Sequence, residues 1–574
     1  MLAMELEGES PDIFDEEWAY YEDQFKLVMD EMRKYNPPEV TLSALTETGR
    51  DESTIPVLKQ RSYTGRKVIS SALADTPCAD LGVHGVFEKL NVILGTSYNL
   101  SSTMSSLLES YIENNYDFGM AYAYLRFYWF HSAITDKLLC EKQRDEKMRS
   151  QVIADDMITE RNMPPRRVWD LYANRVVPYW VGIISWQGIS HAWLDVEERV
   201  DVMTPINGYE WPVPLPKDAD LNLIRVEMLN FGAEYAWLDV LCVRQRDGIR
   251  EDLRKEEWKL DIPTIGGVYG VRYKDKLDGV VCYLSGLGLP LNIKPGDLES
   301  DRCWFRRAWS LQEVPNGSDP LIGGDTGDDR IMDKDMQTTV YERLRSLSQM
   351  RLIGMPFNIL SQMQERVSMS HLDKFASLVC LFNMKYIPIF DIEGSAEHFW
   401  AAVMDAMSRS SRADFFFYYP GPGNGKVFWR PSWDQVMTSI LPRDEGQPNV
   451  GGVDRTEKID SDWYEGPRID SIYVNGLAET SGEPRWGKLS IKDNTGGFCE
   501  CKIIANHTYP IPDGWYTLIG TGGRRIRSGR TWVVGRQRYG KKFEKVSVIS
   551  LADDEEVGKL RELGVERCLH TDIC

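Results

Sequence analysis

The alternation of strand-like and helix-like segments between residues 166 and 319 constrains the fold of this chain more than any other feature. Short apolar runs such as EYAWLDVLCV and GVVCYLSGL alternate with helix-like runs such as LNLIRVEMLNFG and REDLRKEEWKLDIPTIGGVYG. Such alternation is typical of a parallel sheet covered on both faces by helices. Because VVCYL is apolar at almost every position, we expect this strand to be buried on both sides.

The 574 residues are too many for a single core, and changes in pattern divide the chain into five segments. Residues 1–80 are irregular and acidic, whereas residues 81–165 have apolar side chains at helical spacing. Residues 166–325 carry the α/β alternation, and residues 326–420 are again helical. In residues 421–574, short alternating runs separated by Gly, Asn or Asp predict an antiparallel sheet or a small barrel.

Charge and hydropathy narrow the classes of function. The formal net charge of −20 argues against nucleic acid as a partner, because phosphate binding needs a basic surface. No apolar run approaches the roughly 20 residues needed to cross a bilayer. The acidic opening residues lack the basic and apolar parts of a secretory signal. We therefore expect a cytoplasmic protein without a membrane span.

Metal and cofactor motifs are not evident in the sequence. The ten Cys and seven His are scattered, which favours reduced thiols and no metal site. Cys499 and Cys501 have no matching second pair and fit alternate faces of a strand. The run GTGGRR at residues 520–525 leads into another strand, which favours a hairpin loop over a dinucleotide fingerprint. We expect no required cofactor.

Candidate binding residues lie where three of the predicted strands end. Ser190 and His191 follow one strand, Asp239 lies towards the end of a second, and Ser285 follows a third. In an open parallel sheet, ligands bind beyond the carboxyl ends of the strands, because loops and helix N-termini converge there. Plainer roles stay open: Asp239 also suits a turn cap or a pair with an arginine, and His191 a hydrogen-bonded structural histidine.

The run RCWFRRAWSLQEV at residues 302–314 predicts a helix with a carboxylate opposite its apolar face. Arg306 and Glu313 are one heptad apart, so we expect them to lie together, with Trp309 beside them. This group is either a surface salt bridge next to a partly buried indole or a site that cleaves the N-glycosidic bond of a nucleotide. In such a cleavage a carboxylate stabilises positive charge on the ribose, and an aromatic face holds a base by stacking.

Two of these runs resemble signatures of a known family. YAWLDVLCVRQ resembles the Y-x-W-(I/L)-D-x-(L/Y)-C-(I/V)-x-Q signature of the fungal heterokaryon-incompatibility (HET) domain, and RCWFRRAWSLQEV resembles its R-W-F-x-R-(G/A)-W-(T/S)-L-Q-E signature. GISHAW is similar to the family's opening motif, and HLDKFASLVCLF to a helix that often follows. The resemblance covers roughly residues 170–320. The family's usual Trp-Gly is Trp193-Leu194 here, so the tight turn that the glycine allows next to Ser190 and His191 is missing or displaced.

The resemblance implies a role in regulated cell death after recognition of non-self in fused hyphae, or in a related immune-like response. It also implies a flavodoxin-like core, because HET domains are similar to Toll/interleukin-receptor (TIR) domains, some of which hydrolyse NAD. On the TIR pattern, Glu313 is the catalytic glutamate and Trp309 shapes the base pocket. Arg306 then orients or neutralises phosphate, and Asp239 holds a ribose hydroxyl or positions Arg306.

Two functions of different classes follow from the resemblance. The first is a hydrolase that takes NAD or a related nucleotide as its substrate, with Ser190, His191 and Ser285 completing the nucleotide site. The second is a non-enzymatic signalling adaptor that forms homo-oligomers or binds other incompatibility proteins. The position of Glu313 relative to Asp239 and to solvent separates the two.

Overall fold

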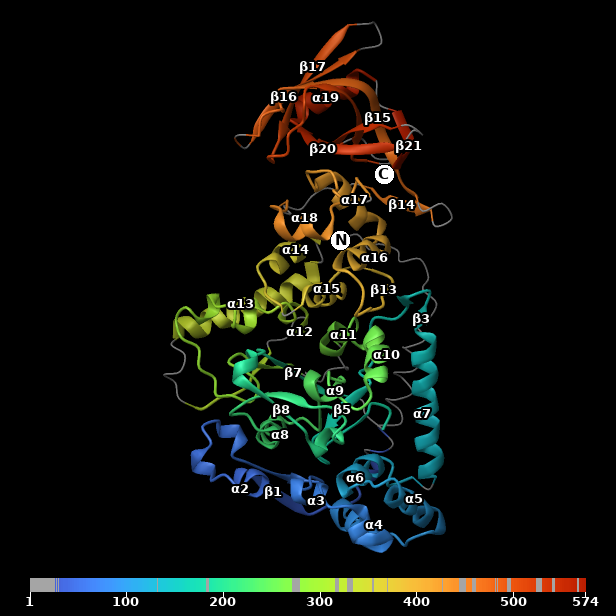
Figure 1. Ribbon diagram of the computed structural model, residues 1–574, viewed down its shortest axis with the longest axis vertical. Coiled ribbons are helices and arrows are strands. Elements are labelled where there is room, and N and C mark those ends of the chain that lie inside the picture. The colour runs from blue at the N-terminus through green and yellow to red at the C-terminus, as the bar shows by residue number, and fades with distance from the viewer. Residues whose placement is uncertain are drawn as a thin grey trace. The chain divides into compact units, whose positions relative to one another are not determined.

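The computed structural model describes the chain in two compact units, Met1–Gln349 with Ile389–Asp391 and Met350–Pro388 with Ile392–Cys574 (Figure 1). Each unit is described by itself. The described residues are all those outside the following positions: 1–25, 27, 29, 132, 182–184, 271–278, 315–319, 328–333, 354–355, 369, 383, 426, 443–450, 457–460, 481, 483, 493–496, 523–528, 539–541 and 565–566.

A six-stranded mixed sheet forms the centre of the first unit. Its strands, in spatial order, are β12 (Leu321–Ile322), β11 (Val281–Tyr283), β7 (Gln187–His191), β10 (Tyr235–Leu238), β5 (Arg167–Asp170) and β6 (Arg175–Pro178). The first four run parallel, whereas β5 is antiparallel to β10 and to β6. The predicted α/β class is confirmed. The predicted parallel sheet is present in four strands, but the whole sheet is mixed, because the β5–β6 hairpin adds antiparallel pairing at one edge.

The central strands are covered on both faces, and all residues of β7, β10 and β11 are buried. On one face, the ring of Tyr269 from α11 (Ile265–Gly270) packs edge-on against Trp237 of β10 at 5.3 Å. On the other face, the hydroxyl of Tyr283 in β11 donates to Glu227 of α8 (Leu221–Asn230). The connecting elements are β8 (Arg199–Val202), β9 (Val213–Pro216), α8 (Leu221–Asn230), α9 (Asp239–Cys242), α10 (Glu251–Asp261) and α11 (Ile265–Gly270).

Elements that precede the sheet in the chain also belong to the first unit. They are β1 (Glu39–Ser43), α2 (Ala44–Thr48), β2 (Ser62–Arg66), α3 (Ser71–Ala74), α4 (Cys78–Leu94), α5 (Ser102–Glu113), α6 (Phe118–Arg126), α7 (Ile134–Gln151), β3 (Ile153–Ala154) and β4 (Met157–Ile158). The segment that carries β1 to α3 is thus ordered, although the sequence pattern of residues 1–80 is irregular.

A buried ion pair fixes this early segment to the central sheet region. Glu47 Oε2 accepts a hydrogen bond from the backbone N–H of Ser71 at 3.0 Å and lies 3.3 Å from Nη1 of Arg225 in α8. Arg225 also donates to the carbonyl oxygens of Ile69 at 2.6 Å and Leu171 at 2.7 Å. Because both charged side chains are inaccessible to solvent, removing either one would leave an unpaired buried charge.

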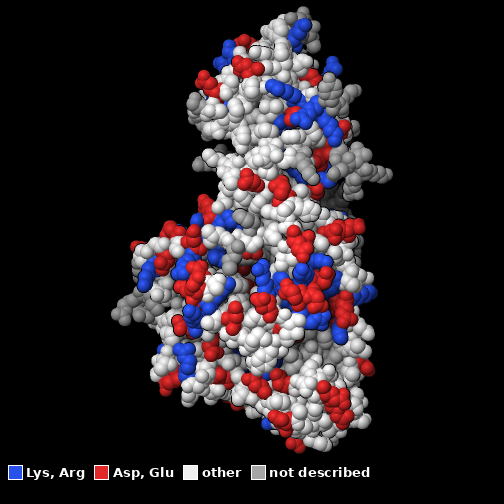
Figure 2. Space-filling view, in the orientation of Figure 1, with Lys and Arg blue, Asp and Glu red and all other residues white. Residues whose placement is uncertain are grey.

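The charged face of α10 is stabilised by pairs along the helix. Arg254 pairs with Glu251, and Lys259 Nζ lies 2.9 Å from Glu256 Oε1, each three residues away. On the face seen in Figure 2, acidic and basic side chains are intermixed. Arg254 is buried, whereas Lys259 and Glu256 are exposed. An exposed pair of this kind contributes about 0.3–0.5 kcal/mol, so α10 depends mainly on its buried side for stability.

The second unit combines helices with an antiparallel β-structure. Most of helix α13 (Lys334–Ile353) belongs to the first unit, and only its end lies in the second. The helices of the second unit are α14 (Pro356–Gln364), α15 (His371–Val379), α16 (Ala396–Ala406), α17 (Arg409–Tyr418) and α18 (Trp433–Thr438). The later elements are β14 (Val453–Thr456), β15 (Ser461–Asn475), β16 (Arg485–Lys492), β17 (Phe498–Ala505), β18 (Gly514–Gly520), β19 (Thr531–Gln537), β20 (Phe543–Leu551), α19 (Asp554–Glu562) and β21 (Arg567–Ile573). The predicted antiparallel β-structure is confirmed.

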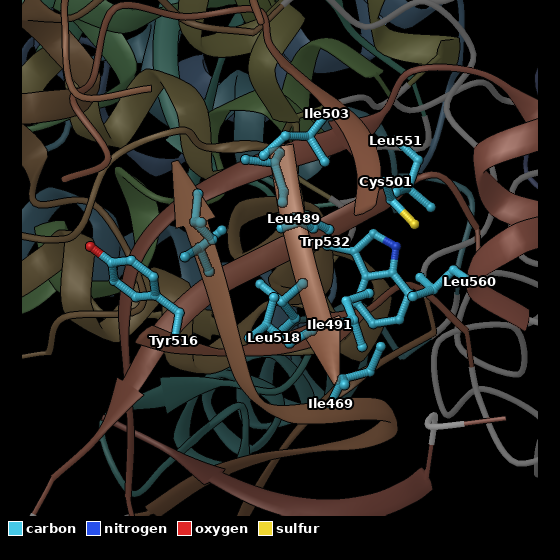
Figure 3. Close-up of a cluster of buried hydrophobic side chains, with 14 of the residues drawn as sticks. Ile469, Leu489, Ile491, Cys501, Ile503, Tyr516, Leu518, Trp532, Leu551 and Leu560 are labelled. Carbon is cyan, nitrogen blue, oxygen red and sulfur yellow. The ribbon is translucent and has the colours of Figure 1, made fainter. Parts of the chain in front are cut away.

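The strands of the second unit close into a barrel. The strands β15, β16, β17, β20, β19 and β18 pair in this order, and β15 pairs again with β18. Figure 3 shows the apolar side chains inside, including Leu489, Ile503 and Leu518 around Trp532, with Leu560 of α19 at one side. A closed barrel has no free strand edges. The alternating sequence pattern predicts the strands but leaves open whether they form a sheet or a barrel.

A buried lysine joins the barrel to α17 within the second unit. Lys545 of β20 donates through Nζ to the carbonyl oxygens of Phe415 at 3.1 Å, Phe416 at 2.8 Å and Tyr419 at 2.7 Å. The last carbonyl groups of a helix have no partner within the helix. The lysine therefore satisfies the C-terminal end of α17, while burial lowers the pKa of its own amine well below the usual value.

Candidate functional site

The carboxyl ends of β7 and β10 bring together three of the predicted site residues. Ser190 and His191 are the last residues of β7, and Asp239 directly follows β10, which is the parallel neighbour of β7. His191 Nε2 lies 3.0 Å from Asp239 Oδ1. Adjacent parallel strands end at the same edge of a sheet, which accounts for the meeting of residues that are 48 positions apart.

Glu313 reaches this edge from the short helix α12 (Ser310–Glu313). The hydroxyl of Ser190 donates to Glu313 Oε2 at 2.6 Å. The indole N–H of the fully buried Trp304 donates to Ser190 Oγ at 2.8 Å. Because the hydroxyl accepts from the indole, its own proton is directed at the carboxylate.

The environment of Glu313 holds its carboxyl group near the midpoint of titration at neutral pH. Burial raises the pKa of Glu313 to about 7, against the lowering effect of the Ser190 hydrogen bond. The charge of Asp239 adds to the rise in pKa, whereas His191 and Arg307 oppose it. As a whole residue, Glu313 is half-buried and not fully inaccessible to solvent.

His191 and Asp239 form a second polar pair beside Glu313. Burial lowers the pKa of His191, but the charges of Asp239 and Glu313 and the hydrogen bond to Asp239 outweigh burial and raise the pKa overall. Asp239 Oδ1 also accepts from the backbone N–H of Val240 at 2.8 Å, and 24% of the Asp239 side chain is exposed. The imidazole stacks on Trp193 at 5.5 Å. Asp239 is thus both the cap of a turn and the partner of a histidine.

Arg306 does not lie where the heptad argument places it. The expected continuous helix is interrupted, since Trp304–Arg306 form a 3-10 helix and Arg307 is extended, with ψ of 140°. Arg306 Nη2 pairs instead with Asp301 Oδ1 at 3.2 Å. The neighbouring arginine, Arg307, is the one whose charge, together with that of His191, lowers the pKa of Glu313. Equal spacing along a helix positions side chains only where the helix is unbroken.

Trp309 and Ser285 are placed near the ends of their predicted elements. Trp309 directly precedes α12 and is partly exposed. The Ser285 hydroxyl donates to the carbonyl oxygen of Asn292 at 3.2 Å and accepts from the backbone N–H of Asn292 at 2.9 Å. Ser285 therefore closes the loop after β11, and its hydrogen bonds do not join the Glu313 group.

The sequence analysis did not identify the packing of Tyr269 against β7 next to Ser190. The hydroxyl of Tyr269 donates to the carbonyl oxygen of Ile189 at 3.0 Å, and a Cβ at Gly188 would lie only 2.7 Å from the Tyr269 ring. Burial is the main cause of the raised pKa of the Cys282 thiol, and the charge of Glu313 raises this pKa further. The glycine of GISH and the tyrosine of GGVYG are the signals that would have indicated this packing.

A second buried carboxylate provides a contrast to Glu313. Glu227 Oε2 accepts from Gln60 at 2.7 Å and from Tyr283 at 2.8 Å, and Oε1 accepts from the backbone N–H of Gly324 at 2.8 Å. Glu227 is inaccessible to solvent, and both of its oxygens have donors. Glu313 Oε1 has no hydrogen bond within the described residues. Glu227 is therefore a structural group, and Glu313 is the carboxylate with capacity for a further partner.

Comparisons with known proteins do not indicate a family or a function for this chain. No family model, curated protein or solved structure matches the chain. In the described parts of the chain, no group of three or more His, Cys, Asp and Glu is arranged to hold a metal ion. Every helix among the described residues is too short or too polar to span a bilayer. The functional argument therefore depends on the geometry around Glu313.

Proposed function

We propose that the chain is a HET-domain protein whose α/β core hydrolyses NAD or a related nucleotide, with Glu313 as the catalytic carboxylate. One observation carries the proposal. Residues from three of the four HET-like motifs meet in one polar group, with Ser190 between Trp304 and Glu313 and with His191 paired to Asp239. The parallel strands bring Ser190, His191 and Asp239 to one edge of the sheet. Trp304 and Glu313 reach the same edge from the segment after β11, more than a hundred residues later in the chain, and it is this second convergence that supports a shared site.

The strand order supports the finer proposal of a flavodoxin- or TIR-like core. Numbered along the chain, β7, β10, β11 and β12 are the first to fourth parallel strands, and their spatial order is second, first, third, fourth. This is the flavodoxin-like order, in which ligands bind where the first and third strands diverge. Ser190, the partner of Glu313, lies at the end of the first of these strands.

The proposed chemistry needs an ionised carboxylate next to the sugar. Hydrolysis breaks the bond between C1′ and the nicotinamide nitrogen, which keeps the electron pair, and water then adds to C1′ and releases a proton. Because the pyridinium leaves as a neutral molecule, the leaving group needs no general acid. Glu313 would stabilise the positive charge that develops on the ribose, in its ionised form. Activity should therefore rise through pH 7, where Glu313 titrates.

Neighbouring groups have consistent roles in this proposal. Asp239 Oδ2 has no hydrogen bond among the described residues and is available to accept one from a ribose hydroxyl. Trp309, partly exposed at the start of α12, would border the base. The charge of Arg307 lowers the pKa of Glu313. Arg307 would therefore orient or neutralise phosphate, which is the role that the sequence analysis gave to Arg306. Loss of cellular NAD would then be the output of a cytoplasmic non-self response.

The test is NAD consumption by the purified full chain at high concentration. Glu313→Gln should lower turnover by about 100-fold or more, the usual cost of losing a group that stabilises charge in the transition state. Glu299→Gln, at an exposed carboxylate that pairs with Arg343, is the matched control and should leave turnover unchanged. Equal turnover by wild type and Glu313→Gln would remove Glu313 from the mechanism.

A signalling adaptor is the second candidate, favoured by apolar side chains at the surface. Val196, Val200, Met203 and Tyr209, in the segment between β7 and α8, are 40–62% exposed. On this alternative the segment mediates self-association, and the Glu313 group is structural. Sedimentation would then show oligomers that dissociate in Met203→Asp, with no NAD turnover by either protein.

A further inference from the structure

The helical part of the first unit contains a cavity that lies outside the Glu313 group. It has a volume of about 380 Å³ and is lined by residues from α4, α5, the first turn of α7 and the loops that precede α5 and α7. Small-molecule sites are typically concave spaces of about 300–1,000 Å³. None of the residues in the Glu313 group contributes to the lining, so a ligand in this cavity would not occupy the proposed nucleotide site.

Buried aromatic and apolar side chains form the floor of the cavity. Phe87, Trp129 and Ile134 line the cavity and are only 3–6% exposed. Trp129 contacts Phe87 at 5.4 Å and Tyr98 at 6.1 Å between ring centroids. The indole N–H of Trp129 donates to Thr96 Oγ1 at 2.9 Å. The indole is therefore held in place with its polar atom satisfied, and the floor offers aromatic surface to a flat ring system.

Uncharged polar side chains form the rim of the cavity. Asn99, Thr103 and Thr135 line the cavity and are exposed. Their side chains make no hydrogen bond to any described residue, whereas Ser101 accepts from the backbone N–H of Met104 at 3.2 Å and caps α5. Amide and hydroxyl side chains can each donate a hydrogen bond and accept one. The rim therefore has polar groups available for the substituents of a ligand.

The lining carries no charge at neutral pH. Among the described residues that line the cavity there is no Lys, Arg, Asp or Glu. Burial raises the pKa of Tyr98 to about 12. Burial lowers the pKa of His131, and the charge of Lys137 lowers it further, against a smaller opposing effect of Glu31. Both groups are therefore neutral at pH 7, and the lining offers no counter-charge to an ionised ligand.

This uncharged lining selects against ionised ligands. An ionised group would lose hydration in the cavity without gaining an ion pair, which makes its binding unfavourable. The first turn of α7 is no substitute for a basic side chain, because it already carries Asp136. A negative side chain at that position offsets the partial positive charge of the helix N-terminus. The cavity therefore favours an uncharged ligand.

We propose that this cavity binds an uncharged planar aromatic molecule, with its rings on the floor formed by Phe87 and Trp129 and its polar substituents at the rim. The proposal is independent of the hydrolase reaction. It assigns a ligand-binding role to the helical part of the first unit.

Two fluorescent probes test the class of ligand with the full chain. N-Phenyl-1-naphthylamine is an uncharged aromatic amine, and 1-anilinonaphthalene-8-sulfonate has the same ring system with a sulfonate. The amine should bind, and the sulfonate should displace it only at a concentration about tenfold higher or more, because the lining offers no counter-charge. Thr103→Lys adds a positive charge at the exposed rim and should lower the required sulfonate concentration by about threefold or more.

Two substitutions that obstruct the cavity test the location of the site. Met104→Trp places a large side chain in the cavity, and Thr135→Trp does so from an exposed position on the rim. Each should weaken binding of the amine by about tenfold or more, because the added ring takes up space that the ligand needs. Melting curves check that the variants fold. Trp515→Ala, at an exposed indole of β18 in the second unit, is the control and should leave the affinity unchanged.

Four outcomes would contradict the proposal. Undiminished binding of the amine to both obstructed variants would overturn the cavity as the site. Equal potency of the sulfonate and the amine on the wild type would overturn the preference for an uncharged ligand, and so would a Thr103→Lys variant that responds to the sulfonate as the wild type does. A wild type that does not bind the amine up to its solubility limit would overturn the aromatic class of ligand.

Discussion

Replacing Glu313 by Gln should stabilise the first unit at alkaline pH. The ordinary pKa of the group is 4.5, and burial raises the pKa of Glu313 to about 7 in the folded chain. Below pH 4.5 the carboxyl is protonated in both states, so its stabilising contribution is fully present there. As the pH rises through 7, the folded state must release a proton at a cost that the unfolded chain does not bear. At about 1.4 kcal/mol per pH unit, the rise in pKa from 4.5 to about 7 corresponds to a full cost of at most about 3.5 kcal/mol.

Guanidinium unfolding at pH 5 and pH 8.5 measures this contribution. The free-energy difference between Glu313→Gln and wild type, taken from the transition of the first unit, should grow by about 2–3 kcal/mol between these pH values in favour of the variant. Gln keeps an oxygen that accepts from Ser190 and never ionises, so the comparison isolates the charge. Glu299→Gln should show no such pH dependence. A difference that stays constant between pH 5 and 8.5 would refute a buried carboxylate with a raised pKa.

Three further substitutions test other parts of the structure. Ser190→Ala removes a hydrogen bond that lowers the pKa of Glu313, so a carbon-13 NMR titration should place that pKa roughly 1 pH unit higher; an unchanged midpoint would contradict the contact. Lys545→Met leaves three carbonyl groups of the second unit without their donor, and its urea midpoint should fall by an amount equivalent to about 3 kcal/mol. Arg225→Met leaves Glu47 buried and unpaired, and thermal unfolding should report about 3–5 kcal/mol of lost stability, whereas a melting temperature equal to wild type would show that the pair is dispensable.

The sequence predicts those residues of the site that lie at the ends of strands. Ser190, His191 and Asp239 follow apolar runs, and parallel strands end at a common edge, so their meeting needs no knowledge of side-chain packing. Ser285 satisfies the same pattern, yet its hydroxyl bonds to Asn292 because the loop after β11 turns back. Strand ends locate a residue at the edge of the sheet but do not determine the direction of the loop that follows.

Other features could not be predicted from the sequence because they depend on tertiary contacts. The break at Arg307 separates Arg306 from Glu313, and nothing in RCWFRRAWSLQEV marks it, since the run contains neither Gly nor Pro. The indole N–H of Trp304 finds its acceptor in Ser190, more than a hundred residues earlier. The alternating pattern of the last segment predicts strands, but the pairing of β15 with β18 that closes the barrel is a long-range choice.

The long strand β15 has a consequence for the rate at which the second unit forms. Besides its pairs with β16 and β18, it pairs with β21 from Asp462 opposite Ile573 to Arg468 opposite Arg567, so these partners are about a hundred residues apart in the sequence. The chain must close this large loop before the pairing repays the lost entropy, and such contacts slow folding. Refolding of the second unit should therefore be slow, and chains caught before closure expose β-prone apolar strands that associate with one another.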